Sequence, residues 1–128
     1  MHEGLIGVGC DLCAVKRMAR AIDKAHFYER VFLEREREYL ESRGAGRAQS
    51  AAAMFAAKEA VAKALGTGFS AGVMPWCIEV THEASGAPGI ALHGAAAARL
   101  AAIGGARVLL SLTHEGGLAQ AFAVIQSE

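Results

Sequence analysis

The side chains best suited to chemistry gather in one stretch of this chain, residues 55–68. Glu59 and Lys63 are four residues apart, and in a helix this spacing puts both side chains on one face. The sequence Gly66-Thr67-Gly68 follows and offers backbone N–H groups to an anion. A carboxylate, an ammonium and an N–H-rich turn can hold a phosphate together with a divalent metal. The spacing therefore indicates a phosphate site at the end of a helix.

Ordinary structural roles compete with this interpretation. Glu59 and Lys63 would also form a surface ion pair, which stabilises a helix by only about 0.3–0.5 kcal/mol. The 66–68 turn would also serve as a helix C-cap, where the negative end of the helix dipole opposes an anion. The residue types and their spacing leave both interpretations open.

A second carboxylate, Asp11, follows the apolar run at residues 5–10. A carboxylate at the end of an apolar strand needs a hydrogen-bond partner, a cation or solvent. Asp11 could cap a helix that begins near Ala14. It could also join Glu59 in binding Mg²⁺, which proteins hold with one or two carboxylates, water and substrate phosphates.

Two further patterns suggest other chemistry. Cys10 and Cys13 have C-x-x-C spacing, but the chain lacks the strand–helix alternation of a thioredoxin-like fold and a second C-x-x-C for zinc. We therefore expect two half-buried structural cysteines. Ser111 and His114 close a strand with a hydroxyl and an imidazole. Without a G-x-S-x-G elbow or an acid to orient the imidazole, a hydrolytic triad is disfavoured.

The expected elements form an α+β pattern, with most helices early and most strands late. Apolar periodicity predicts strands at residues 5–10, 76–81, 90–92, 107–112 and 118–125. It predicts helices at 14–24, 34–43, 49–65 and 94–103, with a short helical turn at 27–32. Turns are expected at 85–89 and 114–117. Residues 1–128 are expected to form one domain.

The composition limits the classes of protein to consider. The chain of 128 residues is 53% hydrophobic and 20% charged, which favours a folded domain over disorder. Thirteen basic and thirteen acidic residues cancel, so we expect no nucleic-acid partner. The sequence has neither an apolar run of about 18–20 residues nor a signal-peptide pattern, so no membrane association is expected. Three cysteines suit a reducing compartment, so a cytoplasmic location is expected.

Basic residues crowd the first thirty positions of this otherwise neutral chain, which predicts a local surface for an acidic partner. The basic residues are Lys16, Arg17, Arg20, Lys24 and Arg30.

The order of these individually weak signals closely resembles the holo-acyl-carrier-protein synthases, a family of small 4′-phosphopantetheinyl transferases. The resemblance covers residues 5–125. It is carried by Gly9-x-Asp11 with Arg17, Phe55-Ala-Ala-Lys58-Glu59, Lys63 with Gly66-Thr67-Gly68, Gly86-x-Pro88, and Ser111-Leu-Thr113-His114.

The resemblance implies Mg²⁺-dependent transfer of 4′-phosphopantetheine from coenzyme A to a serine of apo acyl carrier protein, releasing adenosine 3′,5′-bisphosphate. It implies a long central helix on a small, mainly antiparallel sheet, and a homotrimer with active sites between subunits. The implied catalytic residues are Asp11, Glu59 and Lys63, with Asp11 and Glu59 as metal ligands. The implied coenzyme A contacts are Lys58, Lys63, Gly66, Thr67, Gly68, Pro88, Ser111 and His114, and the carrier-protein contacts are Arg17, Lys24 and Arg30.

One departure from the family pattern bears on the donor site. The family commonly has Gly-Arg before its Phe-Ala-Ala-Lys-Glu motif, whereas this chain has Ala53-Met54. A cation that would contact coenzyme A is therefore missing or is supplied by another residue such as Lys58. The departure keeps a second hypothesis open, a catalytically silent relative that binds coenzyme A or a carrier protein without transfer.

Overall fold

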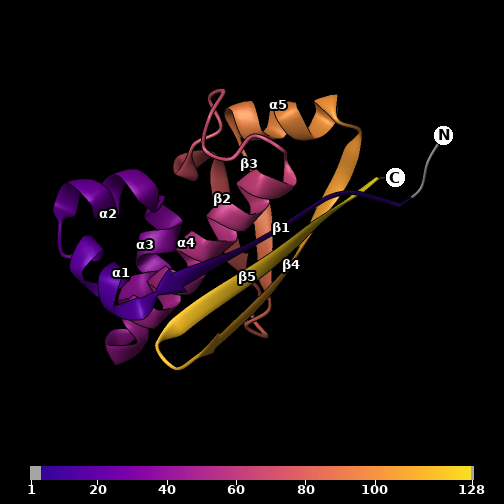
Figure 1. Ribbon diagram of the computed structural model, residues 1–128. Helices are drawn as coiled ribbons and strands as arrows, with labels where there is room; N and C mark the ends of the chain where they lie inside the picture. The colour runs from indigo at the N-terminus through magenta and orange to yellow at the C-terminus, as the bar shows by residue number, and fades with distance from the viewer. Residues whose placement is uncertain (1–3, 128) are drawn as a thin grey trace.

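The computed structural model describes residues 4–127 and confirms the expected α+β class, with a long helix packed on an antiparallel sheet (Figure 1). None of the helices in these residues is long and apolar enough to cross a membrane. In chain order the elements are β1 (Leu5–Ala14), α1 (Val15–Ile22), α2 (Ala25–Val31), α3 (Glu34–Glu41), η1 (Gly44–Gly46), α4 (Arg47–Ala64), η2 (Pro75–Cys77), β2 (Ile78–His82), β3 (Pro88–Leu92), α5 (Gly94–Ala102), β4 (Gly105–Glu115) and β5 (Leu118–Ser127).

Two antiparallel sheets form the β part of the fold. The larger has the strand order β1-β5-β4, and β2 pairs with β3 in the smaller. The helix α4 packs against the larger sheet, while α1, α2 and α3 gather near one end of it and α5 near the other (Figure 1). The inner face of β5 is made of small residues, with Ala119, Ala121 and Ala123 fully buried. Small side chains let the helix and the sheet approach closely.

The closest approach is between β1 and α4. A Cβ on Gly7 would lie 2.2 Å from the carbonyl oxygen of Ala64, and one on Gly9 would lie 2.1 Å from that of Ala60. Only glycine fits at such a contact between backbones. Side chains alternate along a strand, so Asp11 lies on the same face of β1 as these glycines and points toward α4.

Strand β1 is longer than expected, and this changes the role of Asp11. Its pairing with β5 runs from Leu5 opposite Gln126 to Ala14 opposite Leu118, so Asp11 lies inside the strand instead of ending it. Helix α1 has Ala14 as its N-cap and no side-chain cap. The N-cap hypothesis for Asp11 is therefore wrong. Pairing with β5 continues past Asp11 to Ala14 and keeps Asp11 inside the strand.

Other boundaries differ from the expectations by smaller amounts. Trp76 belongs to the short helix η2, because Pro75 starts a helical turn there and β2 begins only at Ile78. His114 and Glu115 extend β4, and the hairpin turn consists of Gly116 and Gly117, both with positive φ. Positive φ at both central residues matches the twist of the flanking strands.

Candidate active site

Asp11 and Lys63 form an ion pair where β1 crosses α4. The Lys63 ammonium donates to Asp11 Oδ1 at 2.8 Å and to the carbonyl oxygen of Cys10 at 3.1 Å. The side chain of Asp11 is 14% exposed and that of Lys63 is 52% exposed, so the pair opens to solvent on the lysine side. Within residues 4–127 no ion pair within 4.0 Å joins Lys63 to Glu59. The hypothesis of a Glu59–Lys63 surface pair is therefore wrong.

Glu59 completes this cluster as a second, partly buried carboxylate. Burial raises the pKa of Glu59, and the charge of Asp11 and a hydrogen bond with Asp11 raise it further, while Lys63 and Arg17 act in the opposite direction. The hydrogen bond to Asp11 raises the pKa of Lys63. Two carboxylates this close repel each other when both are ionised, and a bound cation removes that repulsion.

This donor set fits Mg²⁺. Among residues 4–127, no group of three or more His, Cys, Asp and Glu side chains is arranged to hold a metal. Asp11 and Glu59 would supply two protein oxygens, and water and substrate phosphate would supply the rest. Mg²⁺ accepts such partial coordination by protein, whereas a structural zinc site needs a full set of protein ligands.

The C-x-x-C cysteines face opposite sides of β1. Cys10 is exposed and Cys13 is buried, and both are free thiols. Their odd spacing on a strand requires opposite faces, so these two cysteines cannot chelate one metal. The expectation of two half-buried cysteines is wrong for each of them. Burial raises the pKa of the Cys13 thiol.

The 66–68 turn is a helix C-cap. The N–H of Gly66 donates to the carbonyl oxygen of Lys63, and the N–H groups of Thr67 and Gly68 donate to that of Ala62, at 2.9, 3.2 and 3.0 Å. All three donors thus satisfy the end of α4, which is the C-cap role, and anion binding by this turn stays a prediction. A contact between coenzyme A and other atoms of this turn stays a prediction.

Lys58 is a structural residue. Its side chain is fully buried, and its ammonium donates to Glu36 Oε1 at 2.8 Å and to the carbonyl oxygens of Pro75 and Ile78 at 2.9 and 2.6 Å. Burial lowers the pKa of Lys58, and Glu36 opposes that shift. With all three N–H donors in use and no exposed surface, Lys58 cannot contact coenzyme A, which corrects that prediction.

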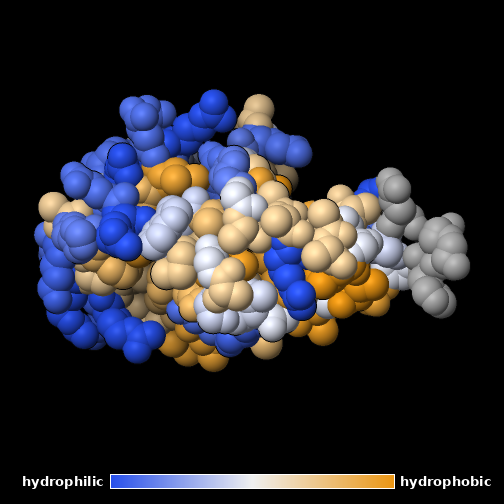
Figure 2. All heavy atoms as spheres, turned by 90° about the horizontal axis from the view of Figure 1, so that it is seen from above, coloured by the Kyte–Doolittle hydropathy of each residue, from blue (hydrophilic) through white to orange (hydrophobic). Residues whose placement is uncertain are grey.

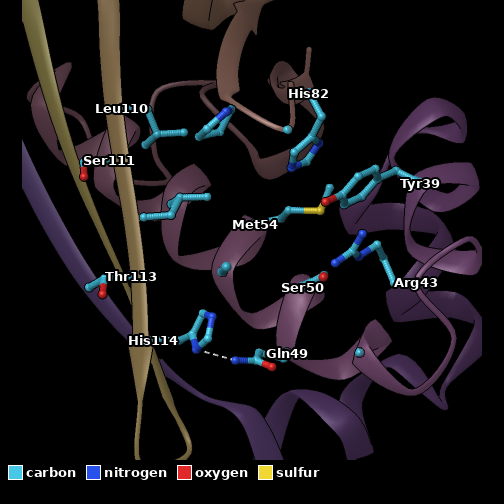
Figure 3. A pocket seen from close by; sticks show the side chains of 15 residues that line it. Tyr39, Arg43, Gln49, Ser50, Met54, His82, Leu110, Ser111, Thr113 and His114 are labelled. Carbon is cyan, nitrogen blue, oxygen red and sulfur yellow. Dashed lines mark hydrogen bonds between the residues drawn. The ribbon is translucent and has the colours of Figure 1, made fainter. Parts of the chain in front are cut away.

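A cavity of about 470 Å³ lies apart from the carboxylate cluster, between the first half of α4, the end of α3, the β2–β3 turn and β4 (Figure 3). His114 points into it and hydrogen-bonds to Gln49, and Pro88 also lines it. Ser111 borders the cavity, but its side chain points away from it (Figure 3). Ser111 and His114 therefore cannot act together as a nucleophile and base, which agrees with the disfavoured triad.

The cavity also contains residues that no motif indicated. Tyr39 and His82 stack with ring centroids 3.7 Å apart, and the guanidinium of Arg43 lies 5.5 Å from the Tyr39 ring centre. Met54, which stands where the family pattern has arginine, is buried beside them. Tyr39, His82 and Met54 lie on α3, β2 and α4, and Arg43 lies in the turn after α3. No regular spacing in the sequence links them.

The predicted docking residues Arg17, Lys24 and Arg30 are all exposed on α1, α2 and the residues between them. Hydrophilic residues cover this helical end of the molecule, whereas hydrophobic residues are more frequent toward the sheet (Figure 2). The Arg30 guanidinium rests 4.7 Å from the centre of the Trp76 ring. Arg17 is near enough to Glu59 to lower its pKa, so the basic surface reaches the carboxylate cluster.

Comparison with known proteins gives the same family as the sequence motifs. Residues 7–113 match the model of the 4′-phosphopantetheinyl transferase superfamily. The holo-[acyl-carrier-protein] synthase of Methylobacterium sp. (strain 4-46) is 48% identical over 96% of this chain and 95% of its own length. The Neisseria meningitidis holo-[acyl-carrier-protein] synthase structure is 33% identical with a TM-score of 0.83, covering 94% of this chain and 98% of that one.

A third relative carries a ligand. The Bacillus anthracis holo-(acyl-carrier-protein) synthase, in complex with CoA (3′,5′-ADP), is 30% identical with a TM-score of 0.81 and covers 98% of this chain and 99% of its own. The fold, the carboxylate–lysine cluster and these matches define one class. The chain belongs to the 4′-phosphopantetheinyl transferase superfamily.

Substitution of Lys58 and of Lys63, the two lysines of α4, should lower the free energy of unfolding by different amounts. Lys58→Met leaves the buried Glu36 carboxylate without its cation, so we expect the free energy of unfolding to fall by about 3–5 kcal/mol. The matched control Lys63→Met removes a partly exposed pair and should cost at most about 1 kcal/mol. Urea unfolding followed by circular dichroism measures both. Equal losses for the two variants would contradict the structural role of Lys58.

Mg²⁺ binding should depend on pH through Glu59. Because the pKa of Glu59 is raised, the metal-free protein holds a proton there to a higher pH than an ordinary glutamate does. Mg²⁺ binds the ionised form, so we expect proton release on binding and weaker affinity as the pH falls through that raised pKa. Calorimetry in buffers of different ionisation enthalpy measures the release. It should disappear in Glu59→Gln, and release that persists in this variant would remove Glu59 from the site.

Proposed function

We propose that this chain transfers 4′-phosphopantetheine from coenzyme A to a serine of apo acyl carrier protein, as a holo-acyl-carrier-protein synthase. The observation that carries the proposal is the cluster of Asp11, Glu59 and Lys63, which β1 and α4 bring together. Relatives bearing that name match over nearly the whole chain. Coenzyme A accompanies similar solved structures at 30% and 27% identity, which supports it as the donor.

The reaction joins the serine oxygen to the phosphorus of the pantetheine phosphate. The bond from that phosphorus to the bridging oxygen breaks, and adenosine 3′,5′-bisphosphate leaves with the electron pair. Lys63, with a side chain half exposed, offers its ammonium to the charge that develops on the phosphates. The serine hydroxyl proton leaves to a base at this cluster, which is either one of the carboxylates or a water molecule held beside them.

Mg²⁺ held by Asp11 and Glu59 would supply charge neutralisation and alignment of the donor phosphates. The chain's own contribution is to hold the Asp11 carboxylate on β1 close to the Glu59 carboxylate on α4. That contact admits no side chain at Gly7 or Gly9, so the separation of the carboxylates is set by the backbone.

A silent relative is the second candidate, and Met54 is the observation that favours it. A buried thioether stands where the family pattern has a cation. The presence of Asp11, Glu59 and Lys63 favours the enzyme, because a protein that only binds its ligands needs no carboxylate pair beside a lysine.

The exposed Arg17, Lys24 and Arg30 suit an acidic carrier protein as partner. Arg17 is near enough to the carboxylate cluster to lower the pKa of Glu59. A carrier protein docked on this surface would therefore present its serine to Glu59. The three free thiols, including the exposed Cys10, suit the reducing cytoplasm.

The outer face of the larger sheet supports a homotrimer as the active form. Cross-strand rows on this face join Val8, Val124 and Leu109, then Cys10 and Phe122. Val8 is 59% exposed and Phe122 is 46% exposed. Contiguous apolar surface of this kind marks a protein interface, and a second and third copy of the same chain would cover it.

The transfer assay tests the function directly. Incubation with apo acyl carrier protein, coenzyme A and Mg²⁺ should add the mass of phosphopantetheine to the carrier protein. Glu59→Gln should lower kcat/KM by about 100-fold or more, because it removes a charge from the reacting centre, and should leave the circular dichroism spectrum unchanged. No mass gain with wild type across several carrier proteins would overturn the enzyme in favour of the silent relative.

The trimer is tested by sedimentation equilibrium. We expect wild type to have the mass of three chains and Phe122→Glu to dissociate, since a charge on the apolar sheet face opposes its burial. Ala98→Glu is the control, because Ala98 is exposed on α5, away from this face. A monomeric wild type, or dissociation by both variants alike, would contradict the proposed interface.

A further inference from the structure

The stacking of Arg30 on Trp76 joins the predicted docking surface to a separate element of the fold. The guanidinium carbon Cζ lies 4.7 Å from the centre of the indole ring. Arg30 belongs to α2 and is exposed, whereas Trp76 belongs to η2 and is partly buried. The orientation of a charged side chain on the surface thus depends on a ring that the interior of the protein holds.

Backbone hydrogen bonds on both sides of Trp76 fix its position. The carbonyl oxygen of Pro75 accepts from the buried Lys58 ammonium at 2.9 Å, and that of Cys77 accepts from the N–H of His93 at 2.8 Å. The ring of Trp76 packs against the hydrophobic core. Trp76 therefore has little freedom to move, and its ring is a fixed surface for a neighbouring side chain.

The charge of Arg30 is left for a partner. In the part of the chain that the structure describes, Arg30 forms no ion pair within 4.0 Å. Arg47 provides a contrast, because its guanidinium also lies 4.7 Å from a ring centre, that of Tyr28, but Glu41 neutralises it at 3.1 Å. Stacking uses the face of a guanidinium and leaves the N–H groups at its edge able to bind a carboxylate.

A guanidinium that is already held binds a partner more tightly than one that is free to rotate. A long side chain loses conformational entropy when a partner immobilises it, and that loss weakens the complex. Contact with Trp76 removes part of this freedom from Arg30 before a partner arrives. Lys24, on the same surface, is exposed and lies over no aromatic ring among the described residues, so it keeps its freedom.

On the basis of the proposed function, we propose that Trp76 is a positioning residue for the docking of the carrier protein. Its indole ring holds the Arg30 guanidinium in the orientation in which the edge N–H groups bind a carboxylate of the acidic carrier protein. Trp76 acts through Arg30 and not on the reacting atoms. The buried Lys58 supports the same contact from below, because it holds Pro75 and with it the start of η2.

The test is a double-mutant cycle on carrier-protein binding, measured by calorimetry without coenzyme A. Trp76→Leu keeps an apolar side chain against the core but removes the aromatic face, so we expect the Kd for apo acyl carrier protein to rise about two- to fivefold. Trp76→Phe should restore part of the affinity. In the Arg30→Gln background, Trp76→Leu should cause no further loss, because the stacked side chain is already absent.

Steady-state transfer separates positioning from general damage to the protein. Trp76→Leu should raise the KM for the carrier protein by the same factor and leave kcat and the KM for coenzyme A unchanged within about twofold. Lys24→Gln is the matched control. It should also weaken binding, but its loss and that of Trp76→Leu should multiply in the double variant, because Lys24 does not stack on Trp76.

The outcomes distinguish this proposal from the proposed function. Independent losses for Trp76→Leu and Arg30→Gln, or normal carrier-protein binding by Trp76→Leu while wild type transfers phosphopantetheine, would overturn the role of Trp76 alone. If wild type binds the carrier protein but transfers nothing, the proposed function fails and the cycle still decides the role of Trp76. A wild type that binds no carrier protein overturns both.

Discussion

The buried ion pair between Lys58 and Glu36 is the interaction on which the arrangement of the helices depends. Lys58 Nζ bonds to Glu36 and to two backbone carbonyls near β2, while Glu36 accepts the N–H groups of Leu33 and Val80. One cluster thus fastens α3, α4, η2 and β2 together. Since a buried charge without its partner costs several kcal/mol, these elements have little freedom to shift. Tyr39 on α3 and His82 on β2, which line the cavity beside Met54, are held in place by it.

A second constraint positions Asp11 and Lys63. Gly7 and Gly9 let β1 lie against the backbone of α4, and the alternation of the strand then aims Asp11 at Lys63. The cluster of Asp11, Glu59 and Lys63 and the cavity beside Met54 therefore both lie along α4, but different contacts position them. The Lys58–Glu36 pair fixes α4 against α3 and β2, and a contact between backbones fixes the end of α4 against β1. In this helix the two lysines differ, since Lys58 is fully buried in the fold whereas the side chain of Lys63 is half exposed.

Much of the fold followed from local pattern. The helix containing residues 49–64 has alanine at most inner positions, and the later strands alternate clearly, so their type was predictable. The boundaries were less so, because the full pairing of β1 with β5 extends β1 past Asp11 to Ala14. The order of the motifs also gave the superfamily, which the comparisons confirm. The order of the motifs along the chain identifies a family even where each motif alone is ambiguous.

The sequence by itself determined which residue types were present for phosphate chemistry and how those on one helix are spaced. Only the tertiary structure decided their partners. Lys63 pairs with Asp11 across the β1–α4 contact and not with its helical neighbour Glu59, and Lys58 is removed from solvent altogether. Arg43 reaches the cavity of Met54 because α3 is fixed against α4. Spacing along a chain reports neighbours on one element, whereas charge pairing and burial arise from elements distant in sequence, which pack only when the whole chain has folded.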